Sequence, residues 1–401
     1  MRKLATITEG IIGQPMFNIF KKAIEMERSG RKVYHFELGD SDYESHLHIR
    51  EATKEALDQD DTHYVEHVGI LELRKAIAEH TEEYVGFRPD LDQIAVIAAN
   101  AVIDFVIRCV ADPGDEIVFS DPGFSTYIAV ANYLGVKRVG VPTREEDAFH
   151  LDPDEIAKRI TDKTRLLIIN SPNNPTGAVL SKEGIEAIYK VAEERDIFIL
   201  SDEMYSRVIY GKVHYSPGIH DKCKERTIIL NGFSKGYSMP GWRLGYAIGP
   251  EKVIEKMGML FQTIYTCAPP FIQRAGIAAL KGNQQVIEER INKFKMLRGL
   301  LVERLNEIPG ISCPVPDGAY YAFPNIGDTG MRSTEFADFV LERAGVTLVP
   351  GTCFGEHGEG HVRICFTKRP EIIEEACARM KEALSDFMSG TEERRLGKGV
   401  R

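Results

Sequence analysis

Residues 231–246, NGFSKGYSMPGWRLGY, place a lysine and an arginine eight residues apart among glycine, serine and aromatic side chains. They follow TIIL (227–230), an apolar run typical of a buried strand. If a desolvated, electropositive site deprotonates the amine of Lys235, that amine becomes a nucleophile able to form Schiff bases. Ser234 and Arg243 are suited to bind a phosphate group. A single lysine is more often a solvated surface residue, so other parts of the chain must decide between a nucleophilic and a surface lysine.

Two more loops that follow apolar runs carry polar side chains able to bind a ligand. In SPNNPTG (171–177) two prolines fix the backbone, so Asn174 presents its amide from a rigid turn, although such residues also mark ordinary turns. Asp202 follows IFIL (197–200), and Tyr205 comes one helical turn later. A helix N-cap is the ordinary role of such an acid. A buried carboxylate at a strand end is also able to hold a cationic nitrogen of a ligand.

The segment HVRICF (361–366) alternates in polarity, which predicts a strand with His361, Arg363 and Cys365 on one face. A surface ion pair is the ordinary role of such an arginine. A half-buried Arg363 would instead face a carboxylate ligand.

Short β-rich runs alternate with helical patterns up to about residue 290. Helical patterns cover 100–111 and 182–195, and another helix starts at Asp152, where an acid precedes a proline. This alternation predicts a mostly parallel sheet with helices on both faces, whose ligands bind at the carboxyl ends of the strands. The expected strands are 93–98, 116–120, 165–170, 197–201, 227–230 and 245–249.

Beyond residue 290 the pattern changes to that of a second, smaller α+β domain. A long helical segment (286–307) is followed by two candidate strands, YYAFPNI (320–326) and GHVRICF (360–366), and by a final helix (370–388). The last residues, GTEERRLGKGVR, have the composition of a charged tail.

Charge and cysteine usage exclude several functional classes. The 401 residues carry 50 Lys and Arg against 60 Asp and Glu, a net charge of −10, so no positive field attracts nucleic acid or an anionic membrane. Seven scattered cysteines without a CxxC pair indicate free thiols in a reducing compartment, not disulfides or a metal site. The N-terminus lacks the apolar core of a signal peptide, and no apolar run reaches ~20 residues. We therefore expect a cytoplasmic protein with no nucleic-acid or membrane partner.

Taken in order, NNPTG, SDEMY and SKGYSMPGWRLGY resemble the motifs of pyridoxal-phosphate (PLP) enzymes of the aspartate aminotransferase superfamily, fold type I, class I/II. The resemblance covers nearly the whole chain, from YHFELGDSDY near the N-terminus to VRICF. It implies an α/β fold: a three-layer αβα large domain with a mostly parallel sheet, plus a smaller α+β domain formed by the N- and C-terminal segments. We expect an N-terminal arm and part of the small domain in 1–45, the large PLP-binding domain in 46–290, and the rest of the small domain with the charged tail in 291–401.

The resemblance also implies roles for the residues singled out above. Lys235 matches the lysine that forms the internal aldimine with PLP and moves the proton between the substrate Cα and cofactor C4′. Asp202 matches the acid that keeps the pyridine nitrogen protonated, so that the ring acts as an electron sink. Tyr205 and Asn174 match the pair that binds the phenolic oxygen of the cofactor.

For the phosphate of PLP, the resemblance implies a clamp of Ser234 and Arg243. Backbone N–H groups of Ala99 and Asn100, at the N-terminus of helix 100–111, would bind the same group. Tyr64 matches a residue that reaches the phosphate of the neighbouring subunit, which implies a homodimer with shared active sites.

The amino acid and 2-oxo acid substrates would lie against PLP. Phe124 matches the aromatic residue that stacks on the cofactor ring, and we expect Phe124, Asn174 and Phe17 to bind the substrate as well. Arg363 matches the arginine that binds the substrate α-carboxylate, and Gly39 supplies a backbone contact to that carboxylate.

Some positions depart from the family pattern. Gly232 stands where many relatives have a phosphate-binding serine, and Asn100 where relatives that act on acidic substrates have a lysine. Pro15 and Phe17 replace small hydroxyl residues near the entrance. We therefore expect a donor that is not primarily aspartate, with Phe17 and Tyr320 lining a less polar side-chain pocket.

These features predict a PLP-dependent aminotransferase that works by a ping-pong mechanism. A PLP-dependent lyase, cyclase or oxidase on the same scaffold is an alternative, because fold and cofactor ligands are shared. A ligand-sensing regulator is a third, which would need a basic DNA-binding extension; the sequence shows none, and its charge is negative.

Overall fold

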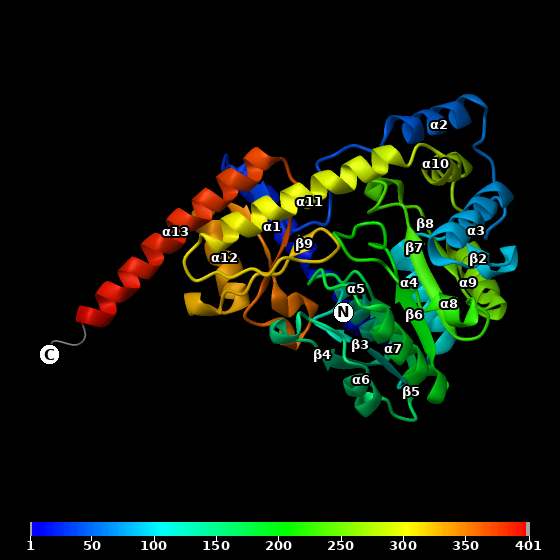
Figure 1. The fold of residues 1–401 in the computed structure, drawn as a ribbon, viewed down its shortest axis with the longest axis horizontal. Helices are drawn as coiled ribbons and strands as arrows, with labels where there is room; N and C mark the ends of the chain where they lie inside the picture. Colours follow the sequence, from blue (N-terminus) through cyan, green and yellow to red (C-terminus); the bar gives the residue numbers. More distant parts are fainter. Residues whose placement is uncertain (1, 398–401) are drawn as a thin grey trace.

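The computed structural model describes residues 2–397, and side chains as far as residue 389. Its centre is a seven-stranded sheet in the order β2-β8-β7-β6-β5-β3-β4 (Figure 1). β8 is antiparallel to both neighbours, and the remaining pairs are parallel, which confirms the predicted sheet. The strands are β2 (Ile94–Ala95), β3 (Glu116–Asp121), β4 (Lys137–Pro142), β5 (Thr164–Asn170), β6 (Phe198–Asp202), β7 (Thr227–Gly232) and β8 (Gly245–Ile248).

Helices cover both faces of this sheet. Successive strand residues point to opposite faces, so each strand places apolar side chains against the helices on both sides. In β5, Leu166 and Ile168 pack into the core shared with α4, α5 and α9, whereas Leu167 and Ile169 pack into a second core with α6 and α7. The fold is therefore the expected three-layer αβα arrangement. The helices of this part are α2 (Leu47–Asp58), α3 (Leu71–Val85), α4 (Ala99–Val110), α5 (Ser125–Leu134), α6 (Pro153–Arg159), α7 (Lys182–Glu194), α8 (Gly218–Asp221), α9 (Glu251–Tyr265) and α10 (Pro270–Lys281).

The six predicted strands and the predicted helix starts correspond to observed elements. Asp152 caps α6 by accepting a bond from the N–H of Asp154, and α4 begins one residue earlier than expected. Strand β4, KRVGVP, was not predicted. It lies at an edge of the sheet, where its two leading cations are exposed, and a glycine and a proline interrupt its apolar run.

The N- and C-terminal segments together form a smaller α+β part beside the sheet (Figure 1). β1 (Tyr34–His35) pairs in parallel with β10 (Val346–Thr347), which joins the two segments. The predicted boundaries at residues 45 and 290 stay a prediction. The other elements are β9 (Tyr321–Ala322), β11 (Val349–Pro350) and β12 (Val362–Cys365), in the order β11-β12-β9, with α1 (Pro15–Arg28), α11 (Gln285–Asn306), α12 (Ser333–Ala344) and α13 (Pro370–Gly397).

The final helix is longer than predicted. α13 continues to Gly397 instead of ending near residue 388, because the intervening residues include good helix formers and no proline. The first part of the expected charged tail is therefore helical, and residues 398–401 of that tail lie outside the described residues. Short 3-10 helices occupy Thr6–Gly10, Leu91–Gln93, Glu145–Asp147, Pro240–Trp242, Gly327–Thr329, Gly351–Phe354 and Glu356–Gly358.

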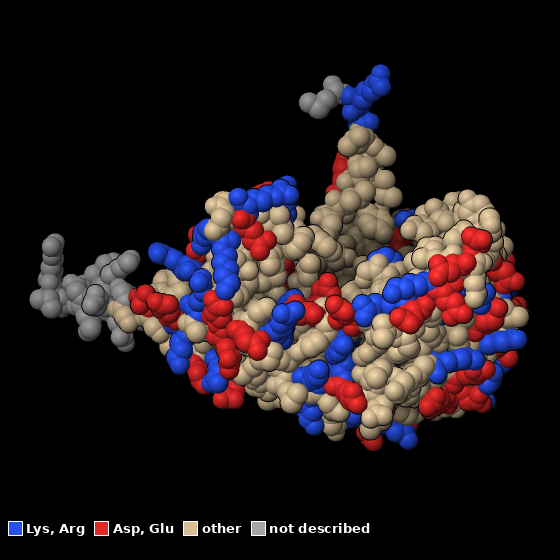
Figure 2. Space-filling view, turned by 90° about the horizontal axis from the view of Figure 1, so that it is seen from above, with Lys and Arg blue, Asp and Glu red and all other residues tan. Residues whose placement is uncertain are grey.

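The described surface carries charged residues of both signs. On the face that Figure 2 shows, Lys and Arg are interspersed with Asp and Glu. Within residues 2–397 no helix has the length and apolar character needed to span a bilayer. No group of three or more potential metal ligands occurs among the same residues. The expected cytoplasmic location stays a prediction.

Candidate active site

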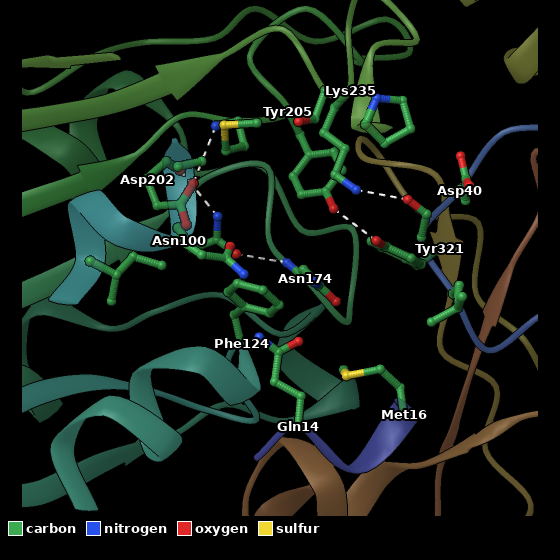
Figure 3. A pocket seen from close by; sticks show the side chains of 18 of the residues that line it. Gln14, Met16, Asp40, Asn100, Phe124, Asn174, Asp202, Tyr205, Lys235 and Tyr321 are labelled. Atoms are coloured by element: carbon green, nitrogen blue, oxygen red, sulfur yellow. Dashed lines mark hydrogen bonds between the residues drawn. The ribbon is translucent and has the colours of Figure 1, made fainter. Parts of the chain in front are cut away.

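A cavity of about 410 Å³ opens at the carboxyl ends of β5, β6 and β7, facing the smaller part (Figure 3). It receives every predicted site residue except Tyr320 and Tyr64, which lie outside the lining, and Tyr64 is 86% exposed. The lining consists of Gln14, Met16, Phe17, Leu38, Gly39, Asp40, Ala99, Asn100, Ile103, Phe124, Asn170, Asn174, Asp202, Met204, Tyr205, Leu230, Ser234, Lys235, Pro240, Arg243, Tyr321 and Arg363.

Lys235 enters the cavity from the loop after β7 (Figure 3). Its Nζ donates a 2.7 Å hydrogen bond to the carbonyl oxygen of Gly39. Burial lowers the pKa of Lys235 to about 8, and the positive charges of Arg363 and Arg243 act in the same direction. The amine therefore loses its proton more easily than an ordinary lysine, as a nucleophile or general base requires.

Asp202 is the last residue of β6 and is 3% exposed. Its Oδ2 accepts a 2.6 Å bond from the hydroxyl of Tyr127, and its Oδ1 accepts a 3.2 Å bond from the N–H of Met204. Burial raises the pKa of Asp202 to about 6, and these two bonds oppose the rise. The carboxylate is thus mainly ionised at neutral pH although it has no ion-pair partner among the described residues.

Asn170 ties the end of β5 to the neighbouring loop and strand. It pairs in register with Asp202, and its Nδ2 donates a 3.1 Å bond to the carbonyl oxygen of Asp202. Its Oδ1 accepts a 2.8 Å bond from the N–H of Asn174. One amide therefore fixes the backbone of both predicted cofactor residues.

Arg363 reaches the cavity from β12 and is 2% exposed, more buried than the half-buried side chain expected. Its Nη1 donates to Asn174 Oδ1 at 3.1 Å, and its Nη2 donates to the carbonyl oxygen of Glu37. The guanidinium lies 4.3 Å from the ring centre of Tyr321. Its Nε has no partner, and no carboxylate of the described chain pairs with it. A buried cation with free donors is suited to an anionic ligand.

Two tyrosines close the side of the cavity next to Gly39. The hydroxyl oxygens of Tyr205 and Tyr321 lie 2.8 Å apart, with Tyr321 opposite Tyr205 in Figure 3. Tyr320 is outside the lining, and its hydroxyl donates a 2.8 Å bond to the Gly39 carbonyl, so the expectation that Tyr320 lines the pocket with Phe17 is wrong. Both rings contact Tyr205 and both hydroxyls lie near Gly39, but only Tyr321 is part of the lining.

The other end of the cavity has the features of an anion site. The N-cap residue of α4, Ala98, makes no side-chain cap, so the first N–H groups of the helix stay available near Ala99 and Asn100. Ser234 and Arg243 line the same cavity. The absence of a serine at residue 232 has a steric reason, because a Cβ added to that glycine would lie 2.9 Å from the backbone Cα of the facing glycine, residue 245.

Comparisons with known proteins agree with this geometry. Residues 31–380 match the model of the family described as aminotransferase class I and II. The chain belongs to this family. An aromatic-amino-acid aminotransferase of Thermococcus litoralis is 41% identical over 371 residues, which are 91% of this chain and 95% of that protein. An aspartate aminotransferase of Pyrococcus horikoshii is 38% identical over 369 residues, 91% and 93% of the two chains. The solved structure of an alanine aminotransferase from Pyrococcus furiosus superimposes with a TM-score of 0.90 and is 35% identical in sequence. The match covers 96% of this chain and 100% of that chain.

The protein is therefore a transaminase, and its substrates are amino acids and 2-oxo acids. Aminotransferases of this family are generally PLP-dependent. Several residues of the aminotransferase site were not predicted from sequence, namely Gln14, Met16, Asn170 and Tyr321 in the lining, and Tyr127, which lies outside the lining and bonds to Asp202. Tyr127 had a weak signal, because it lies three residues after Phe124 and so on the same side of one helical turn.

Gly39 of the aminotransferase has no space for a side chain. A Cβ at this position would lie 1.9 Å from Tyr321 Oη and 3.3 Å from Lys235 Nζ. We expect Gly39→Ala to displace the Tyr321 hydroxyl and to reduce kcat/KM at least about tenfold, a loss of ~1.4 kcal/mol of transition-state stabilisation. Steady-state kinetics test this, with Gly241→Ala as the control, since a Cβ there meets no atom within 4 Å. Equal activities of the two variants would contradict the steric argument.

The lowered pKa of Lys235 predicts a pH-dependent stability of the protein freed of cofactor. Below about pH 8 the amine is charged in both the folded and the unfolded chain, and burial disfavours that charge only in the folded one. This destabilisation disappears as the pH rises from about 8 to the ordinary lysine value of 10.5. Lys235→Met should therefore unfold at higher urea concentration than wild type at pH 7, and the difference should shrink above pH 8. The control is Lys54→Met, at an exposed lysine. A difference in urea midpoint between Lys235→Met and wild type that grows with pH would contradict the prediction.

Proposed function

We propose that this chain is a PLP-dependent aminotransferase that transfers the amino group of an L-amino acid to a 2-oxo acid by a ping-pong mechanism, with Lys235 as the residue that binds PLP covalently. The observation that carries the proposal is the convergence of Lys235, Asp202 and Arg363 on one cavity. These are a deprotonatable amine, a buried carboxylate and a buried guanidinium with free donors, and they come from both the central sheet and the smaller part.

The chemistry of the lining fits PLP. Asp202 would hold the pyridine nitrogen, since a buried ionised carboxylate prefers a cationic partner. Tyr205 and Asn174 would bind the phenolic oxygen, and Phe124 would lie against the ring. The uncapped N-terminus of α4 (Ala99, Asn100), together with Ser234 and Arg243, would bind the phosphate. When bound, PLP supplies an electrophilic carbon for the amino group and a conjugated ring that accepts the electron pair released at Cα.

The residues of the chain supply binding and proton transfer. Arg363 would bind the α-carboxylate of the substrate through its free N–H groups, beside the carbonyl of Gly39. The Nζ of Lys235, whose pKa is lowered to about 8, would take the proton from Cα and return one later. The hydrogen bonds on Asp202 would keep that carboxylate charged throughout.

We further propose a homodimer in which Tyr64 of each subunit completes the phosphate site of the other. This is supported by the 86% exposure of Tyr64 and by its position outside the cavity of its own chain. Exposed apolar side chains of the N-terminal segment, Leu4, Ile7, Ile11 and Ile12, would be covered in the same assembly.

The amino donor is proposed to be neutral or aromatic, not primarily aspartate. The described lining contains three cations, Lys235, Arg243 and Arg363, and each already has a role. No fourth cation of the described lining is left to bind a side-chain carboxylate. Relatives that act on acidic substrates have a lysine at the position of Asn100 and a small hydroxyl residue at that of Phe17. Met16 and Leu38 add apolar surface to the lining.

A half-reaction without any 2-oxo acid tests the function and the donor together. The purified protein with bound PLP is mixed with one amino acid at a time, and the visible absorption of the cofactor is followed. We expect conversion to the pyridoxamine form with neutral or aromatic donors, slower conversion with aspartate, and none in Lys235→Ala. Aspartate as the fastest donor would contradict the donor assignment. Release of ammonia or consumption of oxygen instead would favour a lyase, cyclase or oxidase.

A single substitution tests the role of residue 100. Asn100→Lys adds a cation to the lining near the phosphate end, and we expect it to raise kcat/KM for aspartate about tenfold relative to a neutral donor. Asn100→Met has a side chain of similar length without the charge and should give no such gain. If both variants change the aspartate preference equally, charge at this position does not select the donor.

A further inference from the structure

Both oxygens of the Asp202 carboxylate are held by the chain itself. The hydroxyl of Tyr127, on α5, donates to Oδ2 at 2.6 Å, and the backbone N–H of Met204 donates to Oδ1 at 3.2 Å. Tyr127 is 1% exposed and does not line the cavity. It is therefore placed to act on the acid without touching a ligand.

Two phenylalanines fix the ring of Tyr127. The ring of Phe119 meets it with centroids 5.8 Å apart at 67°, and that of Phe124 at 5.6 Å and 89°. Edge-to-face contacts of this kind favour one ring orientation. Because Phe124 lines the cavity, Tyr127 contacts both the acid and an aromatic residue that faces the ligand.

The titratable groups that act on Asp202 come from three places. Tyr127 donates its bond from α5, Glu203 adds a negative charge from the next residue, and Lys235 adds a positive charge from the loop after β7. Burial raises the pKa of Asp202 to about 6, and the bond from Tyr127 is the largest influence in the opposite direction. A neutral hydroxyl thus favours the charged carboxylate more than the lysine does.

We propose that Tyr127 is a positioning residue for transamination, whose hydroxyl orients the Asp202 carboxylate toward the pyridine nitrogen of PLP and keeps it ionised. This inference rests on the proposed function, which assigns Asp202 to that nitrogen. Tyr127 itself contacts neither PLP nor substrate. If the residue only filled space, its ring would suffice and its hydroxyl would be dispensable.

The test is the titration of Asp202 in protein freed of PLP. Infrared spectroscopy follows the C=O stretch of the protonated carboxyl, which is assigned by its loss in Asp202→Asn. In Tyr127→Phe the midpoint should move upward by about one pH unit, because the variant lacks a hydrogen bond that favours the charged form, and one unit is a tenfold change in the ionisation constant. An unchanged midpoint would overturn the proposal.

Two further proteins separate the hydroxyl from general effects of substitution. Tyr210→Phe is the matched control: Tyr210 is 7% exposed, and its hydroxyl donates to the carbonyl of Ala319 at 2.8 Å, away from the cavity. Its Asp202 midpoint should equal that of wild type, and a shift as large as in Tyr127→Phe would overturn the proposal. Should Tyr127→Phe fail to fold, 3-fluorotyrosine at position 127 keeps the ring and makes the hydroxyl a stronger donor, so the midpoint should move downward.

The same variants are then loaded with PLP labelled with ¹⁵N at the ring nitrogen. In Tyr127→Phe we expect the nitrogen resonance to shift toward the unprotonated form, the half-reaction to slow about tenfold, and the acid limb of its pH profile to move upward. The outcomes distinguish the two proposals. A wild-type protein that binds no PLP would overturn the proposed function, while the titration, made without PLP, still tests the bond from Tyr127. Active wild type with an unchanged resonance and midpoint in Tyr127→Phe would overturn the present inference alone.

Discussion

Five charged side chains line one cavity without forming an ion pair with any described residue, and the rest of the site is arranged around three of them, Asp202, Lys235 and Arg363. Each of these charges is bound by neutral groups. A tyrosine hydroxyl donates to Asp202, and a backbone carbonyl accepts from Lys235. A side-chain amide oxygen and a second backbone carbonyl accept from Arg363. Burying an unpaired charge is costly unless hydrogen bonds replace its hydration. Neutral partners supply part of that replacement and leave each charge available. A ligand with a cationic nitrogen, a reactive carbon and a carboxylate complements all three at once.

This compensation depends on the ends of three adjacent parallel strands. Asn170 ends β5 directly opposite Asp202 at the end of β6, and the loop that carries Lys235 follows β7. Because the carboxyl ends of parallel strands meet at one edge, residues far apart in sequence face a common space. The opposite wall comes from the smaller part, where the Gly39 carbonyl accepts bonds from both Lys235 and Tyr320. The cavity is therefore built from both parts of the chain.

The features that could be predicted from sequence are those encoded in consecutive residues. Apolar runs identified six strands of the central sheet, and the strand end at Asp202 and the loops that carry Asn174 and Lys235 followed from them. The unpredicted features depend on packing between distant segments. The bond from Tyr127 to Asp202 spans 75 residues, and the presence of Tyr321 instead of Tyr320 in the lining depends on how the two rings pack against Gly39 and Tyr205. β4 was missed because an edge strand needs no continuous apolar pattern. The roles assigned to the site residues stay proposals.

The two ends of the site are also connected to one another. Asn170 bonds the backbone of both Asp202 and Asn174, and the side chain of Asn174 accepts a bond from Arg363. The group assigned to the ring nitrogen and the group assigned to the substrate carboxylate thus share one hydrogen-bonded frame. A guanidinium has five N–H donors, and two are used in the described chain, so three remain, including the one on Nε. The frame that joins Asp202, Asn174 and Arg363 through Asn170 thus leaves these donors of Arg363 unused by the described chain.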